Sequence, residues 1–449
     1  MIQISDPRTA TDKVRWFVLI WIAGAVLRLA FVWIEPATRP IADETMWLMS
    51  LDRIPAAGFS PFANYPVFHP PLYPYFLATI NAVFGTLTAI KVAQALLGSL
   101  LILAVGRVAD SLFGTRAGLA CAALVAFYPE FIWYSTHFWC ETLFLSLFWG
   151  AIERVIAAER QGSSRAAMVA GLLFGLGVLT RETILYLLPL AALWLLVVNP
   201  PARRLVLAAT LLGSTLIVVL PWTIRNWIQF HAFIPVSTGG GLNLYQGNAG
   251  ISRNEVYTEY YANEGKVEQY AWARSEGIKA ILRRQPAWIF EKIRDEGPRL
   301  AELDSLALIH LRRGAYEKTT CFEYRAAAGM VLLPWVLIAI ASMVALARLR
   351  IDRGSTFLIG LMGAYLMLHI ATHGFSRYRL PVLPGFMILA STLFENNGAA
   401  GRPWGRRVLL LGLAVALAFL WAPSLLDQLG YLGFLPPPTH EGFAPTCAA

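Results

Sequence analysis

Two adjacent acids, Asp43 and Glu44, stand shortly after the first long apolar stretch of the sequence, in RPIADETMWLMS at 39–50. The residues that follow predict a short helix at a membrane interface, with both acids in its first turn, where the helix dipole favours negative charge. In one interpretation Asp43 caps this helix and Glu44 is merely solvated. In the other, Asp43 is a general base, because a carboxylate hydrogen-bonded to an acceptor hydroxyl can remove its proton during nucleophilic attack.

Basic side chains that could bind a phosphate recur along the chain. One arginine lies in the first apolar stretch and could extend toward the same interface as Asp43. A histidine precedes two prolines that fix the backbone, and three more arginines lie at interfaces, where they can bind lipid phosphates. The alternative for His69 is a structural role, and the alternative for Arg225 is simple anchoring at the interface. The candidate phosphate-binding residues are Arg28, His69, Arg225, Arg377 and Arg379.

A glycine-rich segment, STGGGLNLYQGN at 237–248, is the main candidate for contact with a sugar. Its glycines allow close approach to a polyol, and side-chain amides can both donate to and accept from hydroxyl groups. We therefore take Asn243, Asn248 and the intervening Tyr245 as candidates for binding a sugar or acceptor, together with Glu141 in FWCETLF. Glycine loops are common, so an ordinary surface loop is the alternative.

No metal site is predicted. His369 and His373 are four residues apart on one helix face, a spacing that permits metal ligation, but no adjacent Glu pattern accompanies them. Core or headgroup packing is the alternative interpretation for His369. The four cysteines show no metal-ligand spacing either. A divalent metal therefore stays open as a cofactor, without a defined site.

Composition indicates which elements must position these residues. The chain is 57% hydrophobic and only 14% charged, too little charge for an ordinary soluble protein of 449 residues. Apolar runs near the length that crosses a bilayer recur throughout. We predict an all-α polytopic membrane protein with eleven spans, at 16–34, 87–108, 117–133, 142–158, 166–180, 183–199, 205–223, 326–347, 355–373, 381–396 and 407–423.

The distribution of Arg and Lys predicts the orientation. Sixteen of them flank the spans on one side and six on the other, apart from one long loop, and positive charge marks the cytoplasmic side. The N-terminus is then cytoplasmic, and segments 35–86 and 224–325 lie outside, where the candidate site residues gather. The net charge of +9 follows mostly from this topology, so nothing supports nucleic-acid binding.

The domain organisation follows from these spans. Residues 1–423 form one transmembrane domain with its outer loops, and 424–449 form an exposed outer tail. Thr180-Arg181-Glu182 interrupts 166–199, which therefore reads as two short crossings. The brief apolar segment 70–85 begins with prolines, so it should lie along the outer interface or dip into it. Helical patterning around 265–303 predicts a small outer cap.

Taken together, these motifs resemble the integral membrane glycosyltransferases of the GT-C fold, in the superfamily of the protein O-mannosyltransferases and the lipid A aminoarabinose transferases. The resemblance covers residues 16–390 in the order of that superfamily. The carrying motifs, besides Arg28 and Asp43-Glu44, are HPPLYPYFLA (69–78), CETLFL (140–145), GLGVLTRETILYLLPL (175–190), PWTIRN (221–226), STGGGLNLYQGN (237–248) and RYRLPVLP (377–384).

The resemblance implies transfer of a sugar from a polyprenyl-phosphate donor to a surface glycan, lipid or protein acceptor, outside the cytoplasmic membrane of a bacterium. It makes Asp43 the base of an inverting displacement and Glu44 a supporting acid, with Arg225 and His69 on the donor phosphate. The chain has Phe68-His69 where the aminoarabinose transferases have a Glu-Lys pair. It also lacks the DxD motif of the oligosaccharyltransferases, so no metal requirement follows.

Two other functions use similar lipid-linked substrates. A transporter or flippase typically has polar groups at the membrane midplane and repeated halves, and the sequence shows neither. A polysaccharide polymerase or ligase would share the outer arginines, and would differ by building a long glycan on the carrier.

Overall fold

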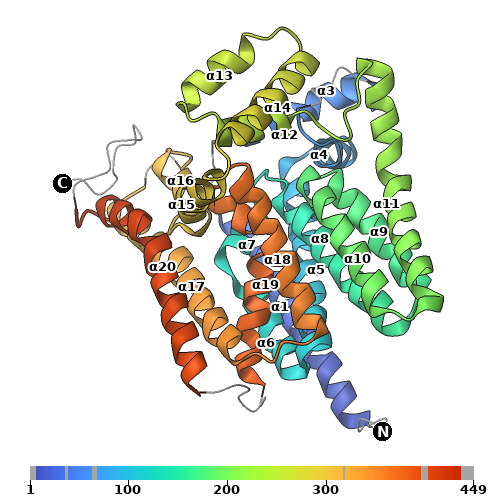
Figure 1. Cartoon of the computed structure of the whole chain (residues 1–449), viewed down its shortest axis with the longest axis vertical. Coiled ribbons are helices and arrows are strands. Elements are labelled where there is room, and N and C mark those ends of the chain that lie inside the picture. The colour runs from blue at the N-terminus through green and yellow to red at the C-terminus, as the bar shows by residue number, and fades with distance from the viewer. Residues whose placement is uncertain (1–6, 36–38, 63–67, 317–318, 396–402, 436–449) are drawn as a thin grey trace.

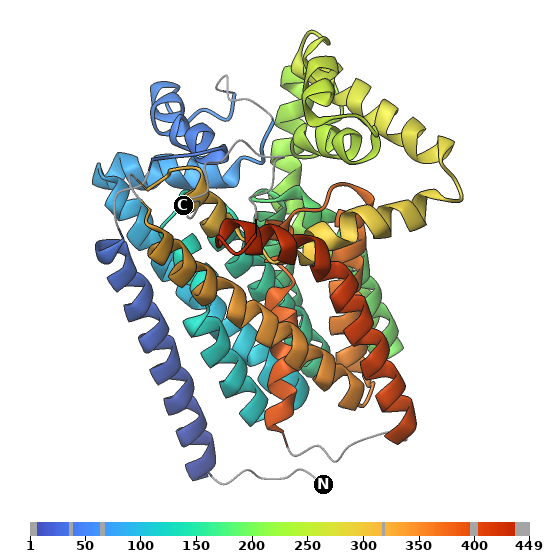
Figure 2. The ribbon, with the colours of Figure 1, turned by 90° about the vertical axis from the view of Figure 1, so that its left-hand side faces the viewer.

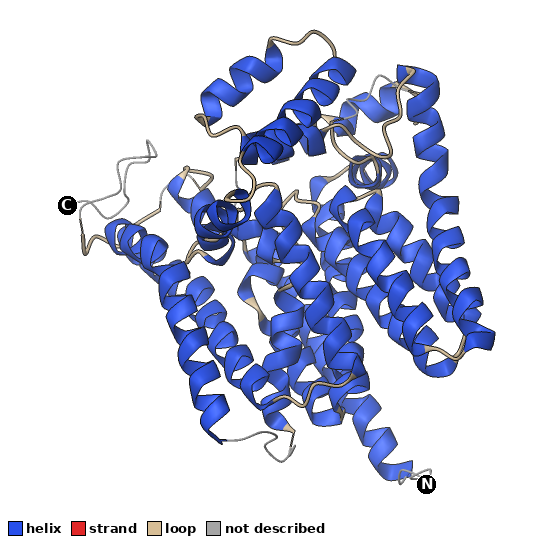
Figure 3. Ribbon diagram, in the orientation of Figure 1, coloured by secondary structure: helices blue, strands red, loops and turns tan. Residues whose placement is uncertain are grey.

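The computed structural model describes residues 7–35, 39–62, 68–316, 319–395 and 403–435. These residues form helices joined by loops and turns and include no strand (Figure 3). Eleven helical segments form the bundle, one for each predicted span: α1 (Pro7–Ile34), α5 (Leu87–Phe113), α6 (Thr115–Phe127), α8 (Glu141–Gln161), α9 (Ser164–Val178), η1 with α10 (Glu182–Leu187 and Leu188–Val198), α11 (Pro201–Phe230), α17 (Cys321–Arg348), α18 (Arg353–Ala371), α19 with η3 (Leu383–Ser391 and Thr392–Phe394) and α20 (Pro403–Tyr431).

Shorter helices gather at one end of this bundle (Figures 1 and 2). They are α2 (Asp43–Leu48), α3 (Ser50–Ala56), α4 (Leu72–Phe84), α7 (Pro129–Tyr134), α12 (Gly239–Asn248), α13 (Arg253–Tyr261), α14 (Lys266–Arg283), α15 (Trp288–Ala301), α16 (Leu306–Arg312) and the 3₁₀ turn η2 (Ser376–Arg379).

The arrangement is that of a multi-pass membrane protein. Six helices, α1, α5, α11, α17, α18 and α20, are long and apolar enough to cross a bilayer. The long loops 35–86 and 224–325 lie at the same end of the bundle, and the N-terminal end of α1 lies at the other (Figure 2). The predicted cap is present as α12 to α16, and α4 stays at the loop end. Which end faces outside stays a prediction.

Two predicted boundaries were wrong. The span at 117–133 is broken, because α6 ends at Phe127 and Pro129 begins the separate helix α7. The exposed tail does not begin at 424, because α20 continues to Tyr431 and buries Ser424, Gln428 and Tyr431. The rest of the predicted tail, 436–449, lies outside the described residues.

Small residues let neighbouring helices approach closely. At Gly171 of α9, an added Cβ would lie 2.3 Å from the carbonyl oxygen of Leu211 on α11, so only glycine fits. Thr215 of α11 donates a hydrogen bond to the Gly171 carbonyl at 3.1 Å. This tight pair of helices carries Arg181 and Arg225 to the loop end.

Candidate active site

Asp43 is the first residue of α2 and forms an ion pair with Arg377, 334 positions later in the chain. Oδ2 of Asp43 accepts a hydrogen bond from Nη1 of Arg377 at 3.0 Å. The preceding Ala42 has a φ of 52°, in the left-handed region that residues other than glycine rarely adopt. The chain thus makes a strained turn immediately before the acid, and such strain is concentrated at functional sites.

Surrounding positive charge keeps Asp43 ionised. Desolvation by itself would raise the pKa of this carboxyl, but the charge of Arg377, with smaller contributions from His69 and Arg181, lowers the pKa below its ordinary value. At neutral pH Asp43 is therefore a carboxylate, the form that can accept a proton.

The protein satisfies only part of the hydrogen-bonding capacity of the Arg377 guanidinium. Its centre lies 5.0 Å from the ring centroid of Trp139 and 5.3 Å from that of Tyr378, both within cation–π range. Its Nε is buried, and no described residue accepts a hydrogen bond from it. A buried donor without a partner is costly, so this nitrogen is available for a ligand.

Arg181 and Glu141 form a second ion pair beside the first. Nη1 of Arg181 donates to Oε1 of Glu141 at 3.2 Å, and the guanidinium lies 5.1 Å from the ring of Tyr378. Both Arg181 and Glu141 act electrostatically on Arg377, which shows that the two pairs are neighbours. Arg181 was not among the predicted phosphate-binding residues, although an arginine that interrupts two apolar helices was a usable signal.

His69 completes this group, in the loop before α4. Desolvation by burial lowers its pKa to about 4, against the opposing charge of Asp43, so the ring is neutral at physiological pH. Its Nε2 is buried and has no hydrogen-bond partner among the described residues, while the ring packs 4.4 Å from Trp47. We call Asp43, His69, Glu141, Arg181 and Arg377 the Asp43 cluster.

Glu44 differs from its neighbour, because its side chain is buried and both oxygens are used. Oε1 accepts from the backbone N–H of Phe138 at 3.0 Å, and Oε2 contacts the N–H of Ile41 at 3.3 Å and Nε2 of His310 at 3.0 Å. Nδ1 of His310 lies 2.9 Å from the carbonyl of Leu306, which can only accept, so Nδ1 carries a hydrogen. These bonds tie α2 to α16 and explain why Asp43 is held in place.

The turn that carries Arg377 is held by buried charges of α15. Nζ of Lys292 donates to the carbonyl of Thr372 at 3.2 Å, and Oε2 of Glu296 accepts from the N–H of Gly374 at 2.8 Å. Lys292 and Glu296 also pair with each other at 3.1 Å. The cap formed by α12 to α16 therefore positions one half of the Asp43–Arg377 pair.

Arg379 faces away from the Asp43 cluster. Its two terminal nitrogens donate to the carbonyls of Glu302 and Asp304 at 2.6 and 2.7 Å, and the guanidinium stacks 4.7 Å from Trp335. The predicted phosphate contact is thus replaced by a structural one. Arg377 and Arg379 diverge because they lie two residues apart on a 3₁₀ turn, which has about three residues per turn.

Arg28 does not extend to the outer interface as predicted. It is fully buried, and its guanidinium donates to the carbonyls of Val125 and Ala126 at 3.0 and 2.9 Å and to Gly24 at 3.0 Å. Val125 and Ala126 belong to the last turn of α6, whose carbonyls have no partner within the helix. Arg28 therefore caps α6 where it breaks inside the bundle.

Arg225 is committed to local contacts at the loop end of α11. Nε donates to the carbonyl of Pro61 at 2.6 Å and Nη1 to Oδ1 of Asn226 at 2.9 Å, while the rings of Trp222 and Phe230 lie 4.6 and 5.3 Å away. These contacts join α11 to the loop after α3. They make Arg225 a structural link instead of the predicted phosphate ligand.

The predicted sugar-binding residues of 237–248 belong to the cap. Asn243 is exposed, and Tyr245 donates a hydrogen bond to Glu259 of α13. Asn248 donates to the carbonyl of Ala371 at 3.0 Å and accepts from the indole N–H of Trp288 at 2.8 Å. Tyr245 and Asn248 therefore hold cap helices together, and only Asn243 presents a free surface.

The two histidines of α18 and its end do not form a metal site with their neighbours. His369 stacks on Tyr378 at 4.6 Å between ring centroids, and Nδ1 of His373 lies 3.7 Å from Glu296. Across the described part of the chain, no group of three or more His, Cys, Asp or Glu side chains could hold a metal ion.

Comparison with known proteins agrees with this fold. Residues 68–227 match the sequence model of the dolichyl-phosphate-mannose-protein mannosyltransferase family. No curated protein matches the chain in sequence.

Two solved structures have a similar architecture. The oligosaccharyltransferase of Archaeoglobus fulgidus in its apo form is 15% identical, with a TM-score of 0.53 over 95% of this chain and 57% of its own. ArnT from Cupriavidus metallidurans bound to undecaprenyl phosphate is 17% identical, with a TM-score of 0.52 over 89% of this chain and 63% of its own. The chain thus spans about three fifths of the length of these proteins. Likeness at this level of identity concerns the architecture alone, and the chain has the GT-C fold.

Proposed function

We propose that the protein transfers a sugar from a polyprenyl-phosphate donor to a hydroxyl group of an acceptor. The observation that carries this proposal is the Asp43 cluster, in which an ionised carboxylate adjoins two buried nitrogens, Arg377 Nε and His69 Nε2, that have no partner among the described residues. This reaction requires a group that takes up the proton of the acceptor hydroxyl and further groups that bind an anion. The Asp43 cluster contains both. The fold supports the same class of reaction.

The proposed reaction is a single displacement with inversion. The acceptor oxygen forms a bond to the anomeric carbon while the bond from that carbon to the donor phosphate oxygen breaks. The acceptor proton goes to Asp43, and the electron pair of the broken bond stays on the polyprenyl phosphate. A phosphate that is already held by cations needs little acid assistance as it leaves.

Arg377 has two roles in this scheme. Without donor it pairs with Asp43 and lowers the basicity of that carboxylate. A bound phosphate would compete for the guanidinium, so its binding weakens the pair and returns basicity to Asp43. Arg181, next to Arg377 and stacked on Tyr378, supplies the second positive charge on the leaving phosphate.

The setting follows from the predicted topology. The Asp43 cluster lies at the loop end of the bundle, which the distribution of Arg and Lys predicts to face away from the cytoplasm. We therefore propose an enzyme of the bacterial inner membrane that acts on its outer side. Its donor would be a lipid-linked sugar presented in the outer leaflet, and its acceptor a surface glycan, a lipid or a protein, as in modification of lipopolysaccharide.

The test replaces Asp43 by Asn in the purified chain, reconstituted in nanodiscs with a polyprenyl-phosphate hexose or pentose and an envelope extract as acceptor. We expect loss of both polyprenyl phosphate release and sugar incorporation, with an unchanged gel-filtration profile. Asp52→Asn is the matched control, because Asp52 is an exposed acid on the adjacent helix α3.

Full activity of Asp43→Asn would overturn the assignment of the base. Movement of the intact lipid-linked sugar across the bilayer, with no new glycosidic bond, would overturn the proposed reaction in favour of a flippase. Growth of a long glycan on the carrier would identify a polymerase or ligase instead.

A further inference from the structure

An open groove lies between the outer cap and the outer end of α11, apart from the Asp43 cluster. Its volume is about 460 Å³, and it is lined by Ala232, Phe233 and Ile234 of the loop after α11 and by one face of α14. The lining residues of α14 recur at helical spacing: Val267, Tyr270, Ala271, Arg274, Ser275 and Ile278. None of these residues was singled out from the sequence.

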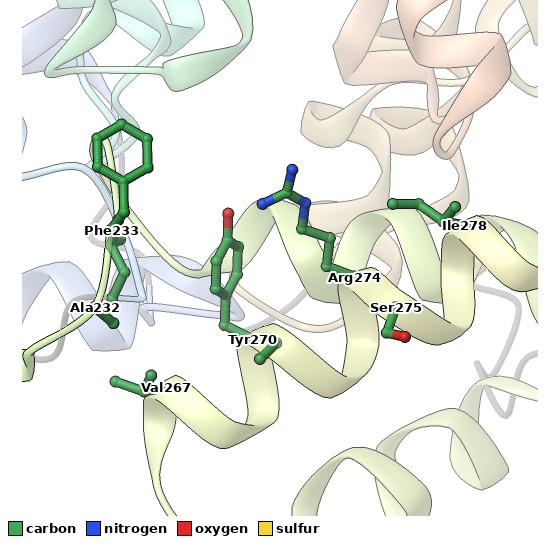
Figure 4. Close-up of a pocket in the computed structure, with 9 residues that line it drawn as sticks. Ala232, Phe233, Val267, Tyr270, Arg274, Ser275 and Ile278 are labelled. Atoms are coloured by element: carbon green, nitrogen blue, oxygen red, sulfur yellow. The ribbon is translucent and has the colours of Figure 1, made fainter.

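The polar groups of the groove are on α14 and point the same way. Figure 4 shows Tyr270 and Arg274 projecting side by side from this helix, with Phe233 alongside on the neighbouring loop. Arg274 is exposed and acts electrostatically on Tyr270, one turn away. Within the described part of the chain, no carboxylate forms an ion pair with Arg274. The groove therefore presents an uncompensated positive charge.

The acid that acts on Tyr270 is engaged elsewhere. Glu182 acts electrostatically on Tyr270, but its Oε2 accepts from the hydroxyl and the N–H of Ser237 at 2.8 and 3.3 Å. That carboxylate is turned to the residues before α12, close to the added Cβ position of Gly240. It stabilises the N-terminal end of α12 and does not pair with Arg274, whose charge remains in the groove.

The groove continues the lipid-facing surface of the bundle. Tyr186 at the start of the α10 segment is 66% exposed and lies near enough to Tyr270 and Arg274 to interact with both. On α11, the last turns before the groove expose Ile224, Trp227 and Ile228, each by more than half. Exposed Tyr and Trp side chains at a helix end are typical of the headgroup level of a membrane. The exposed apolar surface of α11 therefore lies next to the groove that contains Arg274.

We propose that this groove binds the headgroup of an anionic membrane lipid. The phosphate would contact the guanidinium of Arg274 and accept a hydrogen bond from the hydroxyl of Tyr270, as arginine and tyrosine at headgroup depth commonly do. Phe233 and Ile278 would cover the glycerol region, and the acyl chains would lie along the exposed turns of α11. This site does not depend on the proposed transferase activity.

The test uses phosphatidylglycerol with a photoreactive group in its acyl chain, added to the purified full chain in phosphatidylcholine nanodiscs. Peptide mass spectrometry should locate cross-links at the outer end of α11, at 230–234 and on α14. Arg274→Gln should reduce this labelling about fivefold, the effect of one basic residue at a membrane surface.

Arg283→Gln is the matched control, because Arg283 is exposed and lies nine residues later on α14, on the opposite face. It should leave the labelling unchanged. Equal labelling by the same probe with a choline headgroup, or unchanged labelling in Arg274→Gln, would overturn the proposal. Binding of inorganic phosphate that Arg274→Gln abolishes, without any phosphatidylglycerol labelling, would show that the groove takes free phosphate and would overturn a lipid ligand.

Discussion

Substitution of Glu44 tests whether this residue exchanges a proton in the reaction or only positions Asp43. In Glu44→Gln, the amide oxygen can keep the hydrogen bond from the Phe138 N–H. The amide nitrogen can donate to Nε2 of His310 when that ring is neutral with its one hydrogen on Nδ1. Only the 3.3 Å contact with Ile41 loses its acceptor, at a cost of about 1 kcal/mol. We expect Glu44→Gln to fold and to retain transfer activity within about threefold, far less than the loss of a proton-transfer group would cause.

Glu44→Ala removes all three bonds. It leaves the Phe138 N–H and His310 buried without a partner, and each such group costs about 1–3 kcal/mol. We expect the free energy of unfolding to fall by about 2–6 kcal/mol. Because Glu44 and His310 share one contact, Glu44→Ala combined with His310→Ala should destabilise by less than the sum of the single changes.

The assay pairs thermal unfolding in detergent with sugar transfer in nanodiscs for the same preparations. If Glu44→Gln melts like the wild type but loses about 10²–10⁴-fold in transfer, Glu44 itself exchanges a proton during the reaction, and its assignment as a positioning residue is refuted. Activity near wild type with normal melting supports the structural role.

Three further changes probe other parts of the structure. Arg377→Lys should lower transfer by at least about tenfold, because lysine cannot both pair with Asp43 and offer a second donor to phosphate; equal kcat values would contradict this. Arg28→Met should lower the melting temperature, because two α6 carbonyls lose their donors at about 1–3 kcal/mol each, and an unchanged melting curve would contradict the capping role. His69 has a pKa lowered to about 4 by burial, so the unfolded chain takes up a proton first as pH falls, and folded stability is lost from about pH 6.5 down to 4. His69→Gln should reduce that loss, measured as melting temperature against pH, while leaving the melting temperature at pH 8 nearly unchanged.

The helix bundle could be predicted from sequence because a bilayer imposes one strong requirement on it. Every span needs an apolar run of suitable length, and all eleven predicted runs correspond to helical segments. The breaks were harder to predict. The polar interruption at Arg181 does separate two helices, α9 and the η1–α10 segment, and that each of them crosses the membrane stays a prediction. By contrast, α6 ends at Phe127 within an apolar run, where Arg28 of another helix donates hydrogen bonds to its carbonyls.

The site could be predicted only in part, for a geometric reason. All the candidate arginines looked alike in sequence, and their use depends on direction. Arg377 and Arg379 are two residues apart, yet Arg377 pairs with Asp43 and Arg379 binds the backbone carbonyl of Glu302. Glu44 is adjacent to Asp43, yet it is buried against His310, which is 266 positions away. Periodicity reports which residues share a helix face, and it carries no information about contacts made across such separations.

The pairing of the proposed base with an arginine has a consequence for selectivity. A lipid-linked sugar is an activated donor, and a free carboxylate beside it would equally activate water. In this structure the Asp43 carboxylate is held by Arg377 and lies near Arg181, and the charges of these two arginines lower its pKa. Its basicity can rise only when something draws Arg377 away, and the donor phosphate is the ligand with the charge to do so. Arg377 therefore responds to donor binding and also neutralises the charge of the leaving phosphate. Because Asp43 becomes more basic only when Arg377 turns to the phosphate, Asp43 is activated after the donor has bound.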